Sequence, residues 1–242
     1  MQENIKSEKQ KNEKSKKVKK KPSIHFKVNK KGLHVSPCLS FLRIFILPLV
    51  RFFFPFRYFG NNKVTNGACL YVSNHFRMID PMYILPTTKE GIHFIAKAEA
   101  KKMPVFGKFV TAAKTILVGR DGTDARAIID ALKCLKNGEK VAIYPEGTRN
   151  KTDQPFLPFK SGSALLAIRA QVPIIPMVTY KKPRFWRRTD IIIGEPFELS
   201  EYYGVKMTEE LLKEADAKIL AVMQGLRQKH EQMLEEKKGK KN

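Results

Sequence analysis

A histidine and an aspartate stand five positions apart in the stretch VSNHFRMIDP, residues 72–81. His75 follows a short apolar run, and Asp80 directly precedes a proline. An imidazole that accepts a proton works best when a carboxylate fixes its tautomer and stabilises the imidazolium, so the pair has the residue types of a general-base dyad. Asp followed by Pro is also a common helix start, with Asp as the N-cap. The spacing leaves both roles open for Asp80, and one residue could fill both.

A second polar group is YPEGTRN, residues 144–150, which again follows an apolar run. Gly147 allows a ligand to approach the backbone closely, and the guanidinium of Arg149 is a planar fork that suits a phosphate or a carboxylate. Glu146 and Thr148 complete the tetrapeptide EGTR. Glu146 could equally be the salt-bridge partner of the arginine, since four residues alone are weak evidence. We expect this group to bind substrate.

Two further cations stand at similar positions. Arg120 follows the apolar run of TILVGRDG, although a solvent-facing arginine after a glycine turn would read the same way. Lys160 stands at the start of a helical pattern, where free backbone N–H groups favour an anion. The sequence has no spacing typical of metal ligands, no glycine-rich nucleotide loop and no GxSxG nucleophile. We therefore expect direct group transfer without a metal or a cofactor.

Short apolar runs alternate with helical patterns from residue 66 onward, which predicts an α/β fold with a mostly parallel central sheet flanked by helices. Polar groups at the carboxyl ends of such strands gather at one edge of the sheet. The expected inward face of the helix in residues 122–138 is Ile128, Ile129, Leu132 and Leu135, and a last amphipathic helix is expected over residues 208–236. The expected strands are ACLYV, IHFIA, TILV, KVAIY, IIPMV and DIIIG.

Three regions of different composition precede or form this domain. Residues 1–33 are rich in lysine and poor in apolar residues, so we expect a disordered tail. Residues 34–60 are apolar and aromatic but interrupted by arginines and prolines, which favours a helical segment lying in a membrane interface over a buried core helix or a true span. Residues 61–242 would form the catalytic domain with its C-terminal amphipathic helix.

The chain of 242 residues carries a formal charge of +23, so it should be attracted to a polyanion. The lysine-rich tail contains a single aromatic residue, Phe26, which argues against nucleic acid and for anionic membrane lipids. Three scattered cysteines give no disulfide framework, and no secretory signal is visible in the polar first thirty residues or so. We expect a protein at the cytoplasmic face of the cell membrane, peripheral or interfacially inserted.

Together these blocks resemble the 1-acyl-sn-glycerol-3-phosphate (lysophosphatidate) acyltransferase family. Asn74, His75 and Asp80 resemble its NHx4D motif, Glu146 to Arg149 its EGTR motif, and Arg120 its arginine block. The ordered likeness runs from about residue 36 to about residue 204 and includes VPIIPMV as the final proline-bearing strand. It implies transfer of an acyl group from acyl-CoA or acyl-carrier protein to the sn-2 hydroxyl of lysophosphatidate, giving phosphatidate in phospholipid biosynthesis.

The resemblance also implies roles for single residues. His75 would be the general base and Asp80 its orienting partner, while Arg120 and Arg149 would hold the acceptor phosphate and Glu146 would help to shape the acceptor site. Asn74, Gly147, Thr148 and Lys160 are the remaining residues expected to bind substrate. Two alternatives stay open, namely acylation of another acceptor, such as glycerol 3-phosphate or a lyso-aminolipid, and a polybasic protein without enzymatic activity that binds membrane or RNA.

Overall fold

A seven-stranded sheet forms the centre of the structure, a computed structural model that describes residues 23–61, 67–104, 106–119, 125–160 and 162–240. The strand order is β3-β9-β8-β4-β7-β5-β6. The five strands from β8 to β6 run parallel, β9 is antiparallel to β8, and β3 is parallel to β9. The predicted α/β class with a mostly parallel sheet is confirmed. The strands are β3 (Phe56–Gly60), β4 (Cys69–Ser73), β5 (Ile92–Lys97), β6 (Ile116–Val118), β7 (Lys140–Ile143), β8 (Ile174–Thr179) and β9 (Thr189–Ile193).

The six expected strands all occur, because their apolar runs are buried on both faces of the sheet. Every residue of β4, β7 and β8 is buried, as is typical of central parallel strands. β4 lies between β7 and β8, with Leu70 beside Val141 on one side and Ile174 on the other. The carboxyl ends of these three strands therefore lie side by side, which places the residues after Ser73, Ile143 and Thr179 at one edge of the sheet.

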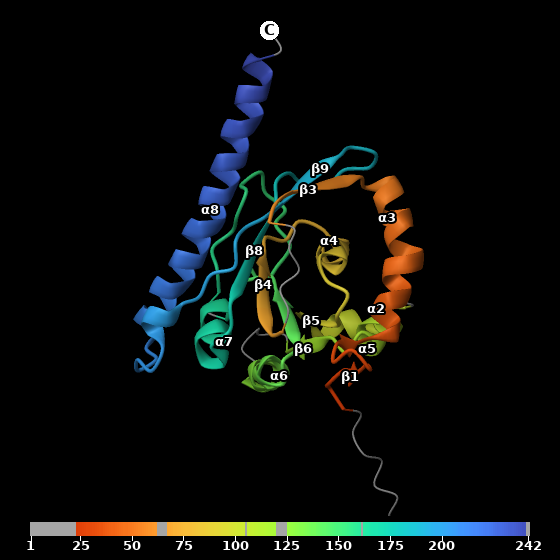
Figure 1. Cartoon of the computed structure of the whole chain (residues 1–242), viewed down its shortest axis with the longest axis vertical. Coiled ribbons are helices and arrows are strands. Elements are labelled where there is room, and N and C mark those ends of the chain that lie inside the picture. Colours follow the sequence, from red (N-terminus) through yellow and green to blue (C-terminus); the bar gives the residue numbers. More distant parts are fainter. Residues whose placement is uncertain (1–22, 62–66, 105, 120–124, 161, 241–242) are drawn as a thin grey trace, which may run out of the picture.

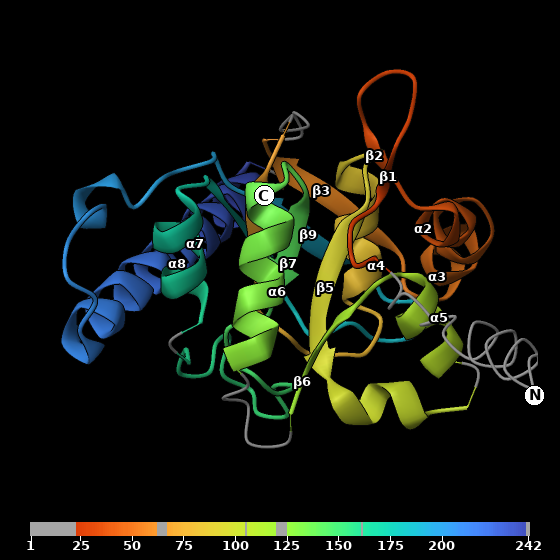
Figure 2. The ribbon, with the colours of Figure 1, turned by 90° about the horizontal axis from the view of Figure 1, so that it is seen from below.

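Helices cover both faces of the sheet, as Figure 1 shows from one side and Figure 2 from below. The helices α6 (Ala125–Lys136), α7 (Ser163–Ala170) and α8 (Glu209–Gly239) cover one face. The other face carries α4 (Pro81–Ile84), α5 (Phe106–Ala112) and the N-terminal helical segment. Short 3₁₀ turns complete the described elements, namely η2 (Leu85–Thr87), η3 (Ala98–Lys102) and η4 (Ser200–Tyr202).

The helix α6 faces the sheet largely as the sequence predicted, with Leu135 buried and Ile128 and Leu132 packed against the core, and it differs at one position. Ile129, expected to point inward, is 49% exposed, whereas the buried residues are Ala127, Ala131, Cys134 and Leu135. Small side chains on this face let the helix approach the strands closely. The capping position expected at residues 123–124 lies outside the described residues. The last helix is confirmed, and its N-terminus is capped by the Thr208 side chain, which accepts from the Leu211 N–H.

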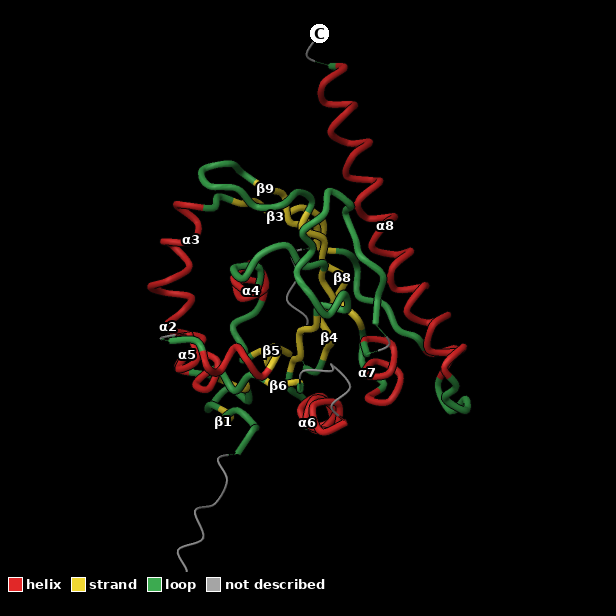
Figure 3. Tube along the Cα trace, turned by 180° about the vertical axis from the view of Figure 1, so that it is seen from behind, coloured by secondary structure: helices red, strands yellow, loops and turns green. Residues whose placement is uncertain are grey.

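The N-terminal helical segment consists of α2 (Pro37–Phe41), the π-helical turn η1 (Leu42–Ile46) and α3 (Leu47–Phe53). The Ser36 side chain caps it, and Arg43 fixes it to the domain by donating to the backbone oxygens of Leu85 and Glu90 at 2.9 and 2.5 Å. No helix within the described ranges combines the length and the apolar character needed to cross a bilayer. Figure 3 shows α3 standing away from the sheet, with α4 between them.

The helical segment is shorter than the sequence suggested. Residues 56–60, which we expected to belong to it, form the edge strand β3, paired in parallel with β9. Arg57, in this strand, donates from Nε to Asp190 Oδ1 at 2.7 Å. The boundary between the helical segment and the sheet therefore lies after Phe53 rather than after residue 60.

The expected disordered tail is also shorter. Residues 23–35 are ordered and include the paired strands β1 (Lys27–Val28) and β2 (His34–Val35). Phe26 is buried and stacks on the His93 ring with centroids 4.1 Å apart. The buried Glu139 carboxylate accepts from the Phe26 N–H at 2.5 Å and lies 2.8 Å from His25 Nδ1. These contacts anchor residues 23–35 to the domain, while residues 1–22 lie outside the described part.

Candidate active site

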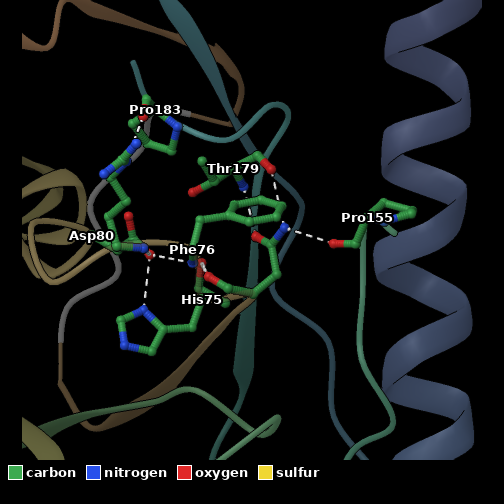
Figure 4. A network of polar contacts seen from close by, with 9 residues as sticks. His75, Phe76, Asp80, Pro155, Thr179 and Pro183 are labelled. Atoms are coloured by element: carbon green, nitrogen blue, oxygen red, sulfur yellow. Dashed lines mark hydrogen bonds and ion pairs between the residues drawn. The ribbon is translucent and has the colours of Figure 1, made fainter. Parts of the chain in front are cut away.

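His75 and Asp80 are in direct contact at the carboxyl edge of the sheet. His75 Nδ1 lies 2.8 Å from Asp80 Oδ2, and the same oxygen accepts from the backbone N–H groups of Phe76 and Arg77 at 2.6 and 2.8 Å (Figure 4). An ionised carboxylate held by three donors keeps the proton on Nδ1, which leaves the lone pair on Nε2. Among the described residues Nε2 has no hydrogen-bond partner, and the His75 side chain is 18% exposed. The geometry is therefore that of an oriented base.

Asp80 does not cap the helix that it precedes. It occupies the N-cap position of α4, but its side chain makes no capping hydrogen bond and its backbone is already helical, with φ −55° and ψ −33°. The carboxylate turns back toward the loop that carries His75 instead. The expectation that Asp80 serves both as cap and as orienting group is wrong for the cap, because the backbone of Asp80 is already helical and its side chain points toward residues 75–77. Its other oxygen, Oδ1, is buried without a hydrogen-bond partner among the described residues.

Asn74 joins three segments rather than facing an open site. Its amide nitrogen donates to the backbone oxygens of Pro155 and Thr179 at 3.1 and 3.0 Å, and its oxygen accepts from the Thr179 N–H at 2.8 Å. Asn74 is fully buried, and both of its N–H donors are used. Its side chain holds the end of β4 against the end of β8. Figure 4 shows two of the partner residues, Pro155 and Thr179. The sequence had suggested that Asn74 binds substrate. From these contacts we infer instead that Asn74 positions His75.

The EGTR loop lies beside His75 because β7 neighbours β4. The Asn150 N–H donates to the His75 backbone oxygen at 2.6 Å, and the Tyr144 ring stacks on the imidazole with centroids 4.2 Å apart. Burial raises the pKa of the Tyr144 hydroxyl, which has no partner among the described residues. Sequence reasoning named neither Tyr144 nor Asn150 as a site residue. The sequence could have indicated both, because they are the first and last residues of the stretch YPEGTRN.

Glu146 is the second carboxyl group near His75. It is 2% exposed, and neither carboxyl oxygen forms a well-aligned hydrogen bond within the described part of the chain, although backbone N–H groups lie nearby. Burial raises the pKa of Glu146 to about 7, with a further increase from the charge of Asp80, although the backbone N–H groups of His75 and Leu157 lower it in part. The alternative that Glu146 pairs with the neighbouring arginine is not supported, because no such ion pair occurs between these two described residues.

Gly147 and Lys160 meet on the outer side of this loop. Gly147 has a φ of +62°, and a Cβ at this position would lie 2.9 Å from Lys160 Cδ, so the lysine stem packs where a side chain would otherwise stand. The Lys160 N–H donates to the Pro145 oxygen at 2.8 Å. Thr148, Arg149 and Lys160 are all exposed. Two cations, Arg149 and Lys160, thus reach solvent from the loop that contacts His75, as an anion-binding rim requires.

Two sequence expectations about anion binding do not appear in this geometry. Arg120 lies outside the described residues, although β6 ends at Val118 on the same edge of the sheet. The first turn of α7, expected to attract an anion, is occupied by the protein itself. Asp216 Oδ1 accepts from the Ser163 hydroxyl at 2.5 Å and from the Ala164 N–H at 3.1 Å. The first turn of α7 is therefore not open to an external anion at Ser163 and Ala164, and the exposed side chain of Lys160 is what remains of this expectation.

One group of potential metal donors lies away from this site. The ligand atoms of His25, Cys134 and Glu139 all lie within 4.8 Å of one another, which the sequence did not suggest because the residues are more than a hundred positions apart or in different elements. Both Glu139 oxygens already meet protein donors, namely the Phe26 N–H and His25 Nδ1. We interpret this group as the hydrogen-bonded anchor of residues 23–35.

Comparison with known proteins agrees with the fold and the motifs. A family model described as Acyltransferase matches residues 56–180, which are 125 of the 242 residues. The chain is 37% identical over 116 residues to the 1-acyl-sn-glycerol-3-phosphate acyltransferase of Helicobacter pylori, covering 46% of this chain and 48% of that protein. It is 34% identical over 113 residues to the 1-acyl-sn-glycerol-3-phosphate acyltransferase beta of Homo sapiens, covering 46% of this chain and 40% of that protein. The chain spans about half the length of these curated relatives.

A solved structure supports the fold. The chain resembles the crystal structure of the 1-acyl-sn-glycerophosphate acyltransferase PlsC from Thermotoga maritima with a TM-score of 0.54 and 22% sequence identity. The match covers 78% of this chain and 81% of that protein. The region matched by the family model includes β3 and the loops of both motifs. Residues 56–60, which the sequence analysis assigned to the interfacial helical segment, therefore belong to the matched region.

Proposed function

Because the chain belongs to the acyltransferase family whose model matches more than half of it, we propose that it acylates the sn-2 hydroxyl of lysophosphatidate. The acyl donor would be a thioester, acyl-CoA or acyl-carrier protein, and the product phosphatidate. The observation that carries this proposal is the oriented His75, whose Nδ1 is held by Asp80 while Nε2 has no partner among the described residues. The names of the relatives in Helicobacter pylori and Homo sapiens support the same acceptor.

The proposed step is a single displacement. His75 Nε2 removes the proton of the acceptor hydroxyl while the hydroxyl oxygen attacks the thioester carbonyl carbon. An oxygen–carbon bond forms, the carbon–sulfur bond breaks, and the thiolate leaves with the electron pair and receives the proton from the imidazolium. Asp80 stabilises the imidazolium through its 2.8 Å contact with Nδ1. The thioester is already activated, so the step needs a base and an anion site.

The acceptor phosphate would bind to two exposed cations, one in the EGTR loop and one packed beside it. Arg149 and Lys160 are exposed, and neither forms an ion pair with another described residue. Arg149 is one position from Asn150, which is bonded to the His75 backbone. A phosphate held there would place the glycerol backbone toward the imidazole. Arg120 belongs to the same proposal on the strength of its motif alone.

We place the reaction at a membrane surface through the N-terminal helical segment. Four of its exposed large apolar residues, at positions 41, 45, 49 and 52, have the spacing of one helix face. The segment lies on the side of the sheet that carries α4. Such an apolar face suits a segment that lies in the interface of a bilayer. The net charge of the chain, +23, would attract it to anionic lipids. The exposed residues are Phe41, Ile44, Phe45, Leu49 and Phe52.

The chain offers a matched control for the catalytic histidine. His230 Nε2 also lies 2.8 Å from an aspartate, Asp190 Oδ2, but this pair is on α8 and β9 and outside the proposed site. We expect His75→Asn to lower kcat by a factor of about 10²–10⁴, the usual contribution of a general base. His230→Asn should keep the kcat of the unmodified enzyme. Acyl transfer to lysophosphatidate by the purified full chain measures both, and a His75→Asn enzyme with full activity would refute the assignment.

The acceptor can be separated from its alternatives by a second assay. Arg149→Gln should raise the KM for lysophosphatidate by about tenfold or more, because a bidentate phosphate contact is lost. It should leave the rate with a phosphate-free monoacylglycerol unchanged. Arg169→Gln, an exposed arginine on α7, is the control. An equal loss with both acceptors would contradict the phosphate contact, and a preference of the unmodified enzyme for glycerol 3-phosphate would contradict the choice of lysophosphatidate.

A further inference from the structure

The loop that joins β8 to β9 carries exposed aromatic rings among many cations. Residues 180–188, here called the β8–β9 loop, read YKKPRFWRR and contain five lysines or arginines and no acidic residue. Phe185 and Trp186 form the tip, where they are 54% and 66% exposed. Trp186 has a φ of +52°, a conformation that usually selects glycine or asparagine. The Trp186 ring lies with its centroid 5.3 Å from that of Phe185 and 6.1 Å from that of Phe53, yet most of the residue remains exposed and open to a partner.

The tip of this loop is fixed to the end of α3. The Trp186 N–H donates to the Phe53 oxygen at 2.7 Å, and the Phe185 ring lies with its centroid 4.7 Å from that of Phe54 and 5.3 Å from that of Phe53. Figures 1 and 3 both show the loop beside the C-terminal end of α3. The exposed rings of the loop therefore continue the exposed apolar face of the N-terminal helical segment.

The same loop is tied to the residues on both sides of His75. Arg77 Nε donates to the Pro183 oxygen at 2.6 Å, and the Arg77 N–H is one of the donors to Asp80. At the base of the loop, Thr179 exchanges two backbone hydrogen bonds with the Asn74 side chain. Figure 4 shows Pro183 and Thr179 in this network. A force that fixes the loop thus fixes the segment that holds the catalytic histidine.

We propose that the β8–β9 loop is a second membrane-docking element, with Phe185 and Trp186 entering the acyl boundary of an anionic bilayer and its cations contacting lipid phosphates. Within the described chain none of its five cations forms an ion pair with a carboxylate, so their charge is available to a partner. The single sign of charge and the continuity with the apolar face of α2 and α3 match a lipid surface. The inference rests on the membrane association proposed above and is independent of the acyl-transfer step.

Trp186 is the only tryptophan of the chain, so its fluorescence reports on this loop alone. With the purified full chain, we expect vesicles that contain phosphatidylglycerol to shift the Trp186 emission to shorter wavelength and brominated lipids to quench it. High salt should weaken the shift, because it screens the phosphate contacts. Vesicle binding measured by flotation without any Trp186 shift would overturn the proposal, since docking would then use the helical segment alone. A shift with RNA but not with vesicles would overturn it in favour of a nucleic acid.

Paired variants separate docking from support of the fold. Phe185→Ala with Trp186→Ala, and separately Arg184→Gln with Arg187→Gln, should each lower the affinity for anionic vesicles about tenfold or more. Ile129→Ala and Lys136→Gln, exposed residues of α6 on the other face of the sheet, should not. All variants should keep the kcat of the unmodified enzyme on a dispersed, short-chain acceptor. Loss of that activity, or unchanged vesicle affinity of both loop variants, would overturn the docking role.

Discussion

At the scale of single residues, two carboxyl groups near His75 have opposite environments. Asp80 Oδ2 meets three N–H donors, whereas Glu146 is buried and neither of its oxygens forms a well-aligned hydrogen bond among the described residues. Burial raises the pKa of Glu146 to about 7. Glu146 is therefore expected to change its protonation state across the neutral range. A neutral Glu146 would also present a hydrogen-bond donor to a ligand oxygen.

Replacement of Glu146 by glutamine should change how stability depends on pH. A carboxyl group whose pKa is higher in the folded than in the unfolded protein stabilises the fold at low pH and loses that contribution as the pH rises through the folded value. Between pH 4.5 and about 7 the free energy of unfolding of the unmodified protein should fall relative to Glu146→Gln by about 3 kcal/mol. Urea unfolding at several pH values measures this difference.

The control for this prediction is Glu235→Gln, because Glu235 is exposed on α8. Its unfolding free energy should run parallel to that of the unmodified protein at every pH. If Glu146→Gln also ran parallel, Glu146 would be ionised across the whole range, and the position would need a cation or a donor that the described residues do not supply.

Residue types were easier to find from the sequence than residue contacts. The spacing of His75 and Asp80 indicated a dyad, and the structure brings the two together. The role of Asp80 as a cap was misjudged. The backbone partners of the Asn74 side chain could not be predicted, because they follow from strand order. Thr179 and Pro155, which engage the Asn74 amide, are 105 and 81 positions away. No local pattern reveals such pairs.

At the scale of elements, a buried carboxylate holds the N-terminal strands to the sheet. Burial alone would raise the pKa of Glu139, but the contacts with His93, His25 and the Phe26 N–H lower it to about 2. Glu139→Gln should lower the free energy of unfolding at pH 7 by about 3 kcal/mol, because it removes a charge-assisted network in the core. Trypsin should then cleave faster at Lys27, Lys30 and Lys31. Thermal unfolding and timed proteolysis measure the two effects.

The pH dependence gives this anchor a distinct signature. A lowered carboxyl pKa contributes stability that is present above about pH 4.5 and lost as the pH falls toward 2, so the difference between the two proteins should vanish in acid. Glu209→Gln, which removes an exposed helical ion pair, is the control. If zinc raised the melting temperature of the unmodified protein but not that of Cys134→Ala, the group would be a metal site and our interpretation of an anchor would be wrong.

Elements were predictable where a pattern is local and were missed where a partner is distant. The six strands follow from apolar runs buried on both faces. The strand β3 was read as part of a helical segment, because its aromatic and arginine residues resemble the sequence before it. Its identity depends on pairing with β9 and on Arg57 meeting Asp190, 133 positions away. The strands β1 and β2 were likewise missed, because the many lysines around them are typical of a disordered segment. Their anchor, Glu139, lies far along the chain.

At the scale of the whole molecule, the two faces of the sheet have different tasks. The helices α6, α7 and α8 close one face with a continuous apolar core. The other face carries α4 and the N-terminal helical segment, whose outward residues are exposed and apolar. The β8–β9 loop connects the end of that segment to the loop of His75. The proposed membrane docking and the proposed chemistry would thereby be joined through one short stretch of chain.

Two truncations should separate the charge of the N-terminus from its structural part. Residues 1–22 contain nine lysines and three glutamates, so their removal lowers the net charge from +23 to +17, since nine minus three is six. We expect weaker binding to anionic vesicles with an unchanged melting temperature, because each lost cation near the surface costs about 1 kcal/mol at most. Removal of residues 1–33 should also lower the melting temperature by several degrees, since it takes Phe26 from its buried position on His93 and the Phe26 N–H from Glu139. Vesicle sedimentation and thermal unfolding of both truncations test this, and equal melting temperatures would show that residues 23–33 do not stabilise the domain.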